Sequence, residues 1–134
     1  MIDYSRIESY GVKKVLYFDS ITSTNLYAKS YTNEDDLLII AGYQSEGRGR
    51  LSRTWESEKD KNITLSLIKS FDIKYPYLIN FYTSYIVQRA LKEYIIKQIG
   101  SDADVLSLKW PNDIMLKDKK TGGILTELID INES

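Results

Sequence analysis

The chain has 134 residues, of which 43% are hydrophobic and 28% are charged, a size and composition typical of one globular domain with its own core. Its 18 basic and 19 acidic residues give a net charge of −1, so it lacks the overall positive charge of a typical nucleic-acid-binding protein. It contains no cysteine and no histidine, which excludes disulfides, thiolate or imidazole metal sites and histidine-based catalysis. No apolar run approaches membrane-spanning length and the first residues do not resemble a signal peptide, so a cytoplasmic location is expected.

The first part of the chain predicts two strands joined by a short helix. β-forming residues favour a strand over 13–18, and a continuous apolar run predicts a buried strand over 37–43. Ser23, Thr24 and Asn25 precede helix-spaced residues and are good N-cap residues, although the same hydroxyls and amides also suit a ligand head group. Gln44 follows the second strand, and its amide can donate and accept hydrogen bonds, which suits an amide- or urea-like group.

The loop Gly47-Arg48-Gly49-Arg50-Leu51-Ser52-Arg53-Thr54-Trp55 comes next. We expect its glycines to adopt positive φ and to bring the backbone close to a ligand. Arginine forks suit phosphate or carboxylate, and a tryptophan can stack on a planar ring. The loop matches neither a Walker A loop nor a Rossmann fingerprint. Taken alone it is equally typical of a solvated surface loop; the alternative is a site for a nucleotide or an acyl-adenylate.

The middle of the chain predicts a strand and a long helix. Residues 62–69 alternate, with Ile63, Leu65 and Leu67 on one face and Thr64 and Ser66 on the other, which predicts a half-buried strand. The helix is expected over 77–99, with Gly100 as its C-terminal stop. Because the helix is broadly apolar, we expect it to be substantially buried. Its predicted stripe consists of Ile79, Tyr82, Ile86, Ala90 and Tyr94, widened by Leu78, Tyr85, Val87, Leu91 and Ile95.

The last part predicts a strand over 105–109, which runs into Trp110-Pro111-Asn112-Asp113, and then a hairpin. The expected hairpin has a basic turn over 117–123 and a final strand over 124–131. The strand pairs predict an α+β fold with a mixed, largely antiparallel sheet backed by helices. Lys109 would place an ammonium where its strand ends, and Gly122-Gly123 would allow close backbone approach just after Lys120. A surface lysine and a plain turn are the alternatives.

Taken together, these motifs resemble the biotin protein ligase family. They appear in the family's order and at similar spacing over about residues 15 to 130, and the arginine loop combined with Lys-Trp-Pro-Asn-Asp is the most specific part. The full set is Ser23-Thr24-Asn25, Tyr43-Gln44, Gly47-Arg48-Gly49-Arg50-x-x-Arg53-x-Trp55, Lys109-Trp110-Pro111-Asn112-Asp113 and Gly123-Ile124-Leu125-x-Glu127.

The resemblance implies the catalytic-domain fold of biotin and lipoate protein ligases, which is class II synthetase-like, and a two-step, AMP-forming reaction. Biotin would react with ATP, accompanied by Mg²⁺, and would then pass to a lysine of a biotin carboxyl carrier protein, a subunit of acetyl-CoA carboxylase or a related carboxylase. The absence of histidine favours biotin over lipoate as the substrate. No nucleic acid and no membrane are expected as partners, and a homodimer is compatible with the resemblance.

The resemblance also implies roles for individual residues. Lys109 and Arg50 are the expected catalytic residues, acting by electrostatic stabilisation of the reacting groups. No metal ligand is expected, and the arginine loop is expected to become ordered over bound ligand. The biotin-binding residues would be Ser23, Thr24, Asn25, Gln44, Gly47, Arg48, Gly49 and Lys109. The ATP- or adenylate-binding residues would be Arg50, Arg53, Trp55, Asn112, Asp113 and Lys120.

The chain departs from the family at both ends. Family members continue into a strand with a Gly-Ile-Gly-x-Asn-like motif and a small C-terminal domain, and some begin with a DNA-binding helix-turn-helix. Residues 1–134 are therefore expected to form one domain, the N-terminal portion of a catalytic domain, with an exposed sheet edge and no repressor function. The alternatives are a truncated, non-catalytic fragment that binds biotin or adenylate, and a nucleic-acid module, against which the balanced charge speaks.

Overall fold

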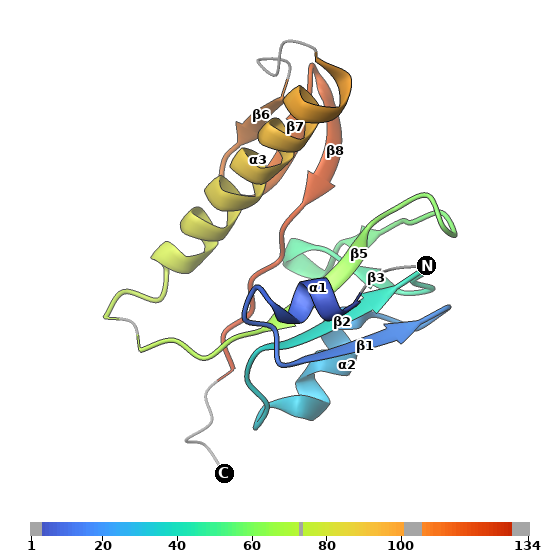
Figure 1. Ribbon diagram of the computed structural model, residues 1–134, viewed down its shortest axis with the longest axis vertical. Helices are drawn as coiled ribbons and strands as arrows, with labels where there is room; N and C mark the ends of the chain where they lie inside the picture. Colours follow the sequence, from blue (N-terminus) through green and yellow to red (C-terminus); the bar gives the residue numbers. More distant parts are fainter. Residues whose placement is uncertain (1–3, 73, 101–105, 130–134) are drawn as a thin grey trace. The chain divides into compact units, whose positions relative to one another are not determined.

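The computed structural model describes residues 4–72, 74–100 and 106–129 and has the expected mixture of helices and largely antiparallel strands. The chain divides into two compact units, unit 1 (Met1–Asp72 with Ile129–Ser134) and unit 2 (Ile73–Leu128) (Figure 1). Among the described residues, no helix is both long and apolar enough to cross a membrane.

Unit 1 is built on a three-stranded sheet in the order β1-β2-β5. Strand β1 (Lys14–Phe18) pairs in parallel with β2 (Leu37–Ala41), which pairs antiparallel with β5 (Thr64–Ile68). Parallel neighbours need a crossover connection. The connection from β1 to β2 consists of α2 (Thr24–Ala28) and the 3-10 turn η1 (Lys29–Tyr31). A short helix, α1 (Tyr4–Glu8), precedes β1.

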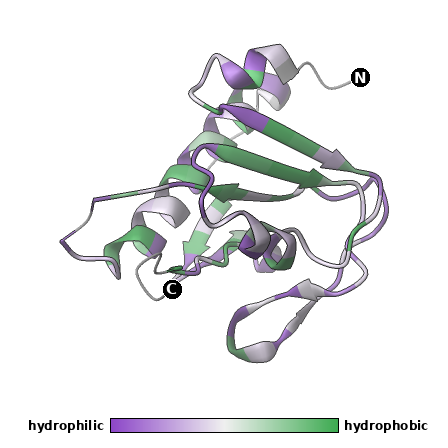
Figure 2. Ribbon diagram, turned by 90° about the horizontal axis from the view of Figure 1, so that it is seen from below, coloured by the Kyte–Doolittle hydropathy of each residue, from purple (hydrophilic) through white to green (hydrophobic). Residues whose placement is uncertain are grey.

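The core of unit 1 lies between β2 and α2. Leu37 and Ile39 are fully buried and pack with Ala28 of α2. Strand β2 is hydrophobic from end to end in Figure 2, as expected for a central strand covered on both faces. The predicted buried strand over 37–43 is therefore confirmed, with its regular part ending at Ala41.

Strand β5 shows the predicted alternation, but its polar face is the buried one. Thr64 and Ser66 are 6% and 7% exposed, whereas Leu65 and Leu67 are 49% and 52% exposed. The register explains this, because Ser66 lies opposite the buried Ile39 on the sheet face that α2 covers. Two hydroxyls thus occupy core positions, where each needs a hydrogen-bond partner.

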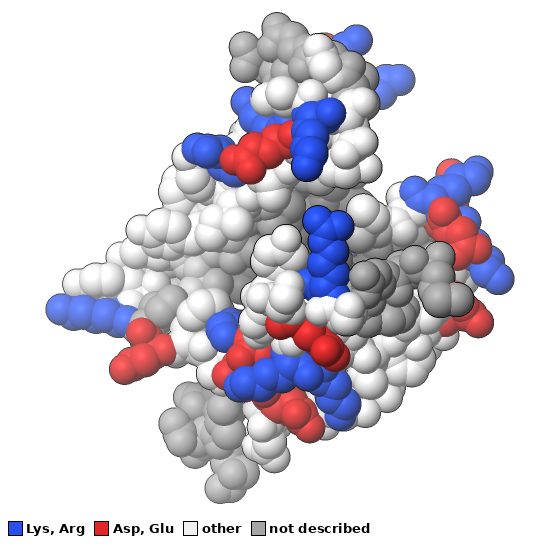
Figure 3. All heavy atoms as spheres, viewed as in Figure 1, with Lys and Arg blue, Asp and Glu red and all other residues white. Residues whose placement is uncertain are grey.

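Ion pairs join the strands at the start of β2. Asp36 is 8% exposed and pairs with Lys69 and with Lys13, whose Nζ lies 3.1 Å from Asp36 Oδ2. Hydrogen bonds from Lys69 and then Lys13 are the main reasons that the pKa of Asp36 lies below its usual value. On the face shown in Figure 3, acidic and basic side chains likewise lie close to one another. We call Lys13, Asp35, Asp36 and Lys69 the ion cluster.

Unit 2 consists of the helix α3 (Leu78–Ile99) and an antiparallel sheet. The sheet contains β6 (Leu106–Lys109), β7 (Asp113–Leu116) and β8 (Lys119–Gly123). Helix α3 ends as expected at Gly100, which has φ 64° and donates its N–H to Ile96 O. The helix packs on β6 and β7, and Leu106 and Ile114 are almost fully buried.

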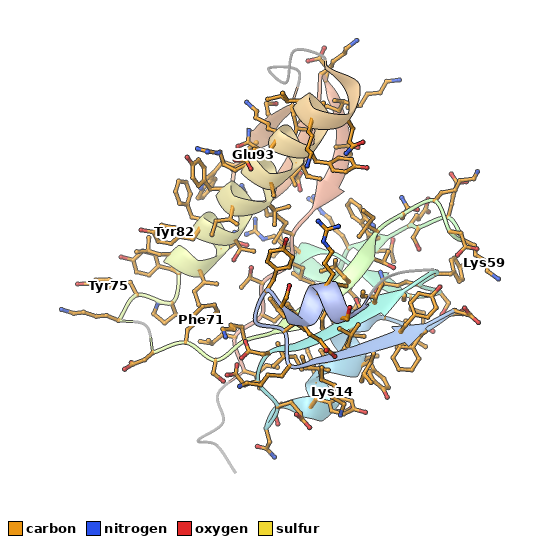
Figure 4. All side chains as sticks on the ribbon, in the orientation of Figure 1. Lys14, Lys59, Phe71, Tyr75, Tyr82 and Glu93 are labelled. Atoms are coloured by element: carbon orange, nitrogen blue, oxygen red, sulfur yellow. The ribbon has the colours of Figure 1, made fainter. Side chains whose placement is uncertain are left out.

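The stripe predicted for α3 coincides only in part with the face that it buries, since Leu78, Ile79, Val87, Leu91 and Ile95 are half-buried. Tyr82, Ile86 and Tyr94 are 58% exposed or more, and Tyr82 points away from the helix in Figure 4. Ser84, in contrast, is fully buried. A helix that is apolar nearly all round does not identify its packing face by hydrophobicity. Here the buried face includes small and polar residues that hydrogen-bond to the sheet and its turns.

The predicted C-terminal hairpin exists, but its turn lies earlier than expected. Residues 117–118 form the turn, with Lys117 at φ 54°, and Gly122 and Gly123 belong to β8. Gly122 lies opposite Ile114, and a Cβ at Gly122 would be 3.4 Å from the Ile114 side chain. The glycines therefore permit a close strand pairing rather than a turn. Residues 124–129 form no strand, and the rest of the predicted final strand lies outside the described residues.

Candidate functional site

Two segments are held together where the parallel strands β1 and β2 end. Ile21 N donates to Tyr43 O over 3.0 Å, and Ser45 N donates to Ile21 O over 3.0 Å. These bonds continue the parallel pairing beyond the sheet, through the bridge between Ile21 and Gln44. They bring the start of α2 beside Gln44, at the carboxyl ends of the strands.

The predicted N-cap is confirmed at the start of α2. Ser23 has extended φ and ψ (−158° and 132°), and its Oγ accepts from Leu26 N over 3.4 Å. Ser23 and Thr24 are 1% and 3% exposed. The cap places both hydroxyls in the interior of unit 1 and so specifies where the Thr24 side chain lies.

Gln44 and Thr24 form a hydrogen-bonded pair with a defined direction. Gln44 Oε1 accepts from Thr24 N over 2.7 Å and from Thr24 Oγ1 over 2.9 Å. A backbone N–H can only donate, so the oxygen of the Gln44 amide must face Thr24. The Gln44 NH₂ group has no hydrogen-bond partner within the described part of the chain, so it keeps its capacity to donate.

Ser66 of β5 completes this group, although sequence analysis did not select it. Its Oγ lies 2.8 Å from Thr24 Oγ1 and within hydrogen-bond reach of Asn25 Oδ1, and its single proton can be donated to one of these two oxygens at a time. The signal in the sequence was the polar face of an otherwise apolar strand, which we assigned no function. We call Ser23, Thr24, Asn25, Gln44 and Ser66 the polar cluster.

The arginine loop forms a small hairpin in unit 1. Strand β3 (Gly47–Arg48) pairs with β4 (Thr54–Trp55), and the 3-10 turn η2 (Arg50–Ser52) connects them. Gly49 N donates to Arg53 O over 2.7 Å and closes the turn. We call residues 47–55 the arginine hairpin.

The expectation that the glycines of this hairpin adopt positive φ is wrong. Leu51 and Ser52 have φ values of 54° and 60°, a region that non-glycine residues seldom occupy. Gly47 is required for a different reason, since a Cβ there would lie 2.3 Å from Trp55 O. The tip of the hairpin therefore holds two residues in a strained conformation.

The arginines of the hairpin are exposed. Neither Arg48 nor Arg53 directs its side chain to an ion-pair or hydrogen-bond partner among the described residues. Arg50 is also exposed but has a partner, and Trp55 is half-buried. Two permanent positive charges are thus presented without a protein carboxylate, an arrangement suited to an anionic ligand.

In unit 2, the Lys109–Asp113 segment is a turn anchored by α3. Lys109 and Trp110 are exposed, and a cis peptide bond precedes Pro111. Pro111 O accepts from Ser84 Oγ over 3.1 Å and from Asn80 Nδ2 over 3.3 Å. The helix thereby fixes the backbone that carries Lys109.

The remaining candidates of unit 2 interact with one another. Asn112 and Ile124 are joined by two hydrogen bonds of 2.9 Å, from Asn112 Nδ2 to Ile124 O and from Ile124 N to Asn112 O. Lys120 Nζ lies 2.8 Å from Asp113 Oδ1. The structure thus groups the predicted residues of unit 1 and, separately, those of unit 2. No cluster of three or more acidic side chains suitable for a metal occurs in the described ranges.

Comparison with known proteins identifies the family of the chain. The sequence matches the biotin/lipoate A/B protein ligase family over residues 15–134. Because this match covers most of the chain, the chain belongs to that family. It is 37% identical over 120 residues to the bifunctional ligase/repressor BirA of Bacillus subtilis, covering 85% of this chain and 34% of that protein. The chain therefore spans about a third of the length of this curated relative.

Solved structures of ligases have the same fold. Biotin protein ligase from Aquifex aeolicus, in complex with biotin and ATP, has a TM-score of 0.72 and 27% identity, over 87% of this chain and 47% of that chain. The Leishmania major enzyme in complex with biotinyl-5-AMP has a TM-score of 0.70 and 26% identity, over 84% of this chain and 51% of that chain. The fold class expected from the sequence is confirmed.

Proposed function

We propose that the chain is the biotin-binding and adenylate-forming part of a biotin–protein ligase. In this reaction the carboxylate of biotin attacks the α-phosphate of ATP, which forms biotinyl-5′-AMP and releases pyrophosphate. The amine of a lysine on a biotin carboxyl carrier protein then attacks the acyl carbon, forming an amide and releasing AMP. Both nucleophiles belong to substrates, in agreement with a chain that has no cysteine and no histidine.

The observation that carries the proposal is the directed pair of Gln44 and Thr24. The Gln44 amide oxygen is occupied by two donors of Thr24, so its NH₂ group is the part available to a ligand. Biotin ends in a neutral urea whose carbonyl oxygen is a strong acceptor. Gln44 is half-buried and lies beside the buried hydroxyl of Thr24, and such a donor favours a ligand with a matching acceptor, since a ligand without one would leave the NH₂ group unpaired in the complex.

We assign the charged residues to the other end of the ligand. Arg50 and the exposed Arg53 would bind the phosphates of ATP and of the adenylate, and Trp55 would pack on the adenine, while Gly47, Arg48 and Gly49 would close on biotin through their backbone groups. In unit 2, Lys109 would stabilise the negative charge on the biotin carboxylate and α-phosphate as the bond forms. The nucleotide would also be bound by Asn112, Asp113 and Lys120.

Mg²⁺ would enter with ATP, held by the phosphate oxygens. We also propose that both units belong to one catalytic domain that acts in the cytoplasm on a carboxylase carrier protein.

A biotin-binding fragment without catalytic activity is the second candidate function. The fact that favours it is length, because the chain covers 34% of its Bacillus relative and about half of the related solved structures. Such a fragment would keep the polar cluster but lack part of the groups that complete the reaction.

The test is biotin-dependent release of pyrophosphate from Mg²⁺–ATP, with mass spectrometry for biotinyl-5′-AMP. Wild-type protein is compared with Lys109→Ala and with Lys97→Ala, which removes an exposed lysine of α3 that has no proposed role. We expect Lys109→Ala to reduce adenylate formation by about 100-fold or more, and Lys97→Ala to leave it unchanged. Biotin binding without adenylate formation by wild type would favour the fragment, and neither activity in folded protein would refute both proposals.

A further inference from the structure

We propose that Ser66 is a positioning residue of the biotin site, acting through Thr24 and Asn25 rather than by contact with the ligand. This inference rests on the proposed function for its ligand, but its structural content concerns only the polar cluster of unit 1. Ser66 is 7% exposed and lies on β5, a strand that contributes none of the other residues of the cluster.

The first step is the position of Ser66 at the base of the cluster. Its hydroxyl reaches Thr24 Oγ1, at 2.8 Å, and Asn25 Oδ1. Both partners lie at the start of α2, which is 41 and 42 residues away in sequence. Ser66 is therefore the point where the sheet holds the helix start by side-chain hydrogen bonds.

The second step is the direction of the hydrogen bonds. When Thr24 Oγ1 accepts the proton of Ser66, the proton of Thr24 is left to donate to Gln44 Oε1, at 2.9 Å. Gln44 Oε1 then has both of its donors, and the Gln44 NH₂ group faces away from Thr24. Because Thr24 N already sets the direction of the Gln44 amide, the role of Ser66 is to hold the Thr24 hydroxyl in place for its hydrogen bond to Gln44.

The neighbouring Thr64 provides a matched comparison. It lies on the same face of β5, is 6% exposed and also has a buried hydroxyl, but that hydroxyl donates to the backbone carbonyl of Ala41. Thr64 therefore supports the pairing of β5 with β2 and has no side-chain link to the cluster. Removing either hydroxyl should weaken the fold, whereas only removal of the Ser66 hydroxyl should change the ligand site.

The experiment measures biotin and ATP affinity by calorimetry, together with thermal unfolding, for wild type, Ser66→Ala and Thr64→Val. We expect Ser66→Ala to weaken biotin binding by about 3- to 10-fold, the effect of one lost hydrogen bond, and to leave ATP affinity unchanged. Thr64→Val should lower the unfolding temperature and leave biotin affinity unchanged. Ser66→Thr, which keeps the hydroxyl, should bind biotin nearly as well as wild type.

Equal loss of biotin affinity in Ser66→Ala and Thr64→Val, or a Ser66→Thr variant as weak as Ser66→Ala, would overturn the proposal. A ligand-free measurement separates it from the proposed function. The side-chain amide NMR signals of Asn25 and Gln44 should shift in Ser66→Ala and not in Thr64→Val. If wild type binds no biotin, the proposed function fails, and these signals alone decide whether Ser66 positions the cluster: a shift supports it and unchanged signals refute it.

Discussion

The two ends of strand β2 carry opposite kinds of polar chemistry. At its start, the ion cluster pairs the carboxylates of Asp35 and Asp36 with lysines. Beyond its end, Gln44 offers an unpaired NH₂ group and the arginine hairpin offers Arg48 and Arg53 without described partners. The first end therefore holds the sheet together by ion pairs, and the second end is where we propose that the ligand binds.

The largest effect should come from removing the donor beyond the end of β2. Gln44→Leu deletes the NH₂ group and leaves the Thr24 N–H and hydroxyl without their acceptor. We expect biotin affinity to fall by about 100-fold, because a site built for a hydrogen-bonding group is left with unpaired polar atoms. Calorimetry measures this loss, and Gln98→Leu on the exposed face of α3 is the control. Unchanged biotin affinity in Gln44→Leu would remove Gln44 from the site.

A smaller effect is expected at the arginine hairpin. Arg53→Ala should weaken ATP binding by about 10-fold, the value of one charge-assisted hydrogen bond. Its unfolding temperature should equal that of wild type, since Arg53 is exposed and has no described partner. Arg6→Ala, at an exposed arginine of α1, is the control for charge alone. The same loss of ATP affinity in both variants would indicate only a general electrostatic effect.

A substitution at the start of β2 should lower stability and leave ligand affinity nearly unchanged. Asp36→Asn removes the carboxylate that pairs with Lys13 and Lys69, so the protein should unfold at a lower temperature. Biotin affinity should stay within about twofold of wild type, because the polar cluster has no bond to the ion cluster. A variant that is stable but binds biotin poorly would contradict the separation of roles.

The smallest expected effect is a change in the stability contribution of Asp36 at acidic pH. The pKa of Asp36 lies below its ordinary value because Lys69 and Lys13 hydrogen-bond to it. Its stabilising contribution is therefore fully present above the ordinary aspartate pKa, near pH 4, and is lost as pH falls through the lower folded-state pKa. Thermal unfolding of wild type and Asp36→Asn from pH 7 to pH 2.5 should show a stability difference that shrinks only below about pH 4. A constant difference would exclude this linkage.

The backbone elements were largely predictable because local rules determined them. The apolar run gave β2, the N-cap gave the start of α2, and Gly100 marked the end of α3. Local rules were insufficient where contacts between distant parts of the chain determine which residues are buried. Thr64 and Ser66 are buried with hydrogen-bond partners on β2 and on α2, and no alternation pattern shows which face of a strand will find such partners.

For the candidate site, sequence analysis named residues but did not predict their relative positions or their hydrogen bonds. Ser23, Thr24 and Gln44 do lie together in unit 1, but the direction of the Gln44 amide depends on Thr24 N, which only the fold brings near. Gly47 was misinterpreted, because it allows a close strand approach instead of a positive φ, and Gly122 and Gly123 belong to β8 and not to the turn in which they were placed. Close approach depends on the partner strand and leaves no local signal.

The most direct test is a titration of biotin into isotope-labelled protein, followed through backbone and side-chain amide NMR signals. The account predicts that the Gln44 side-chain amide and the backbone amides of Thr24 and Ser66 shift, while those of Lys13, Asp36 and Lys69 stay in place. Shifts centred on the ion cluster, or no shift at the polar cluster in folded protein, would contradict the assignment of the ligand to the carboxyl ends of β1 and β2.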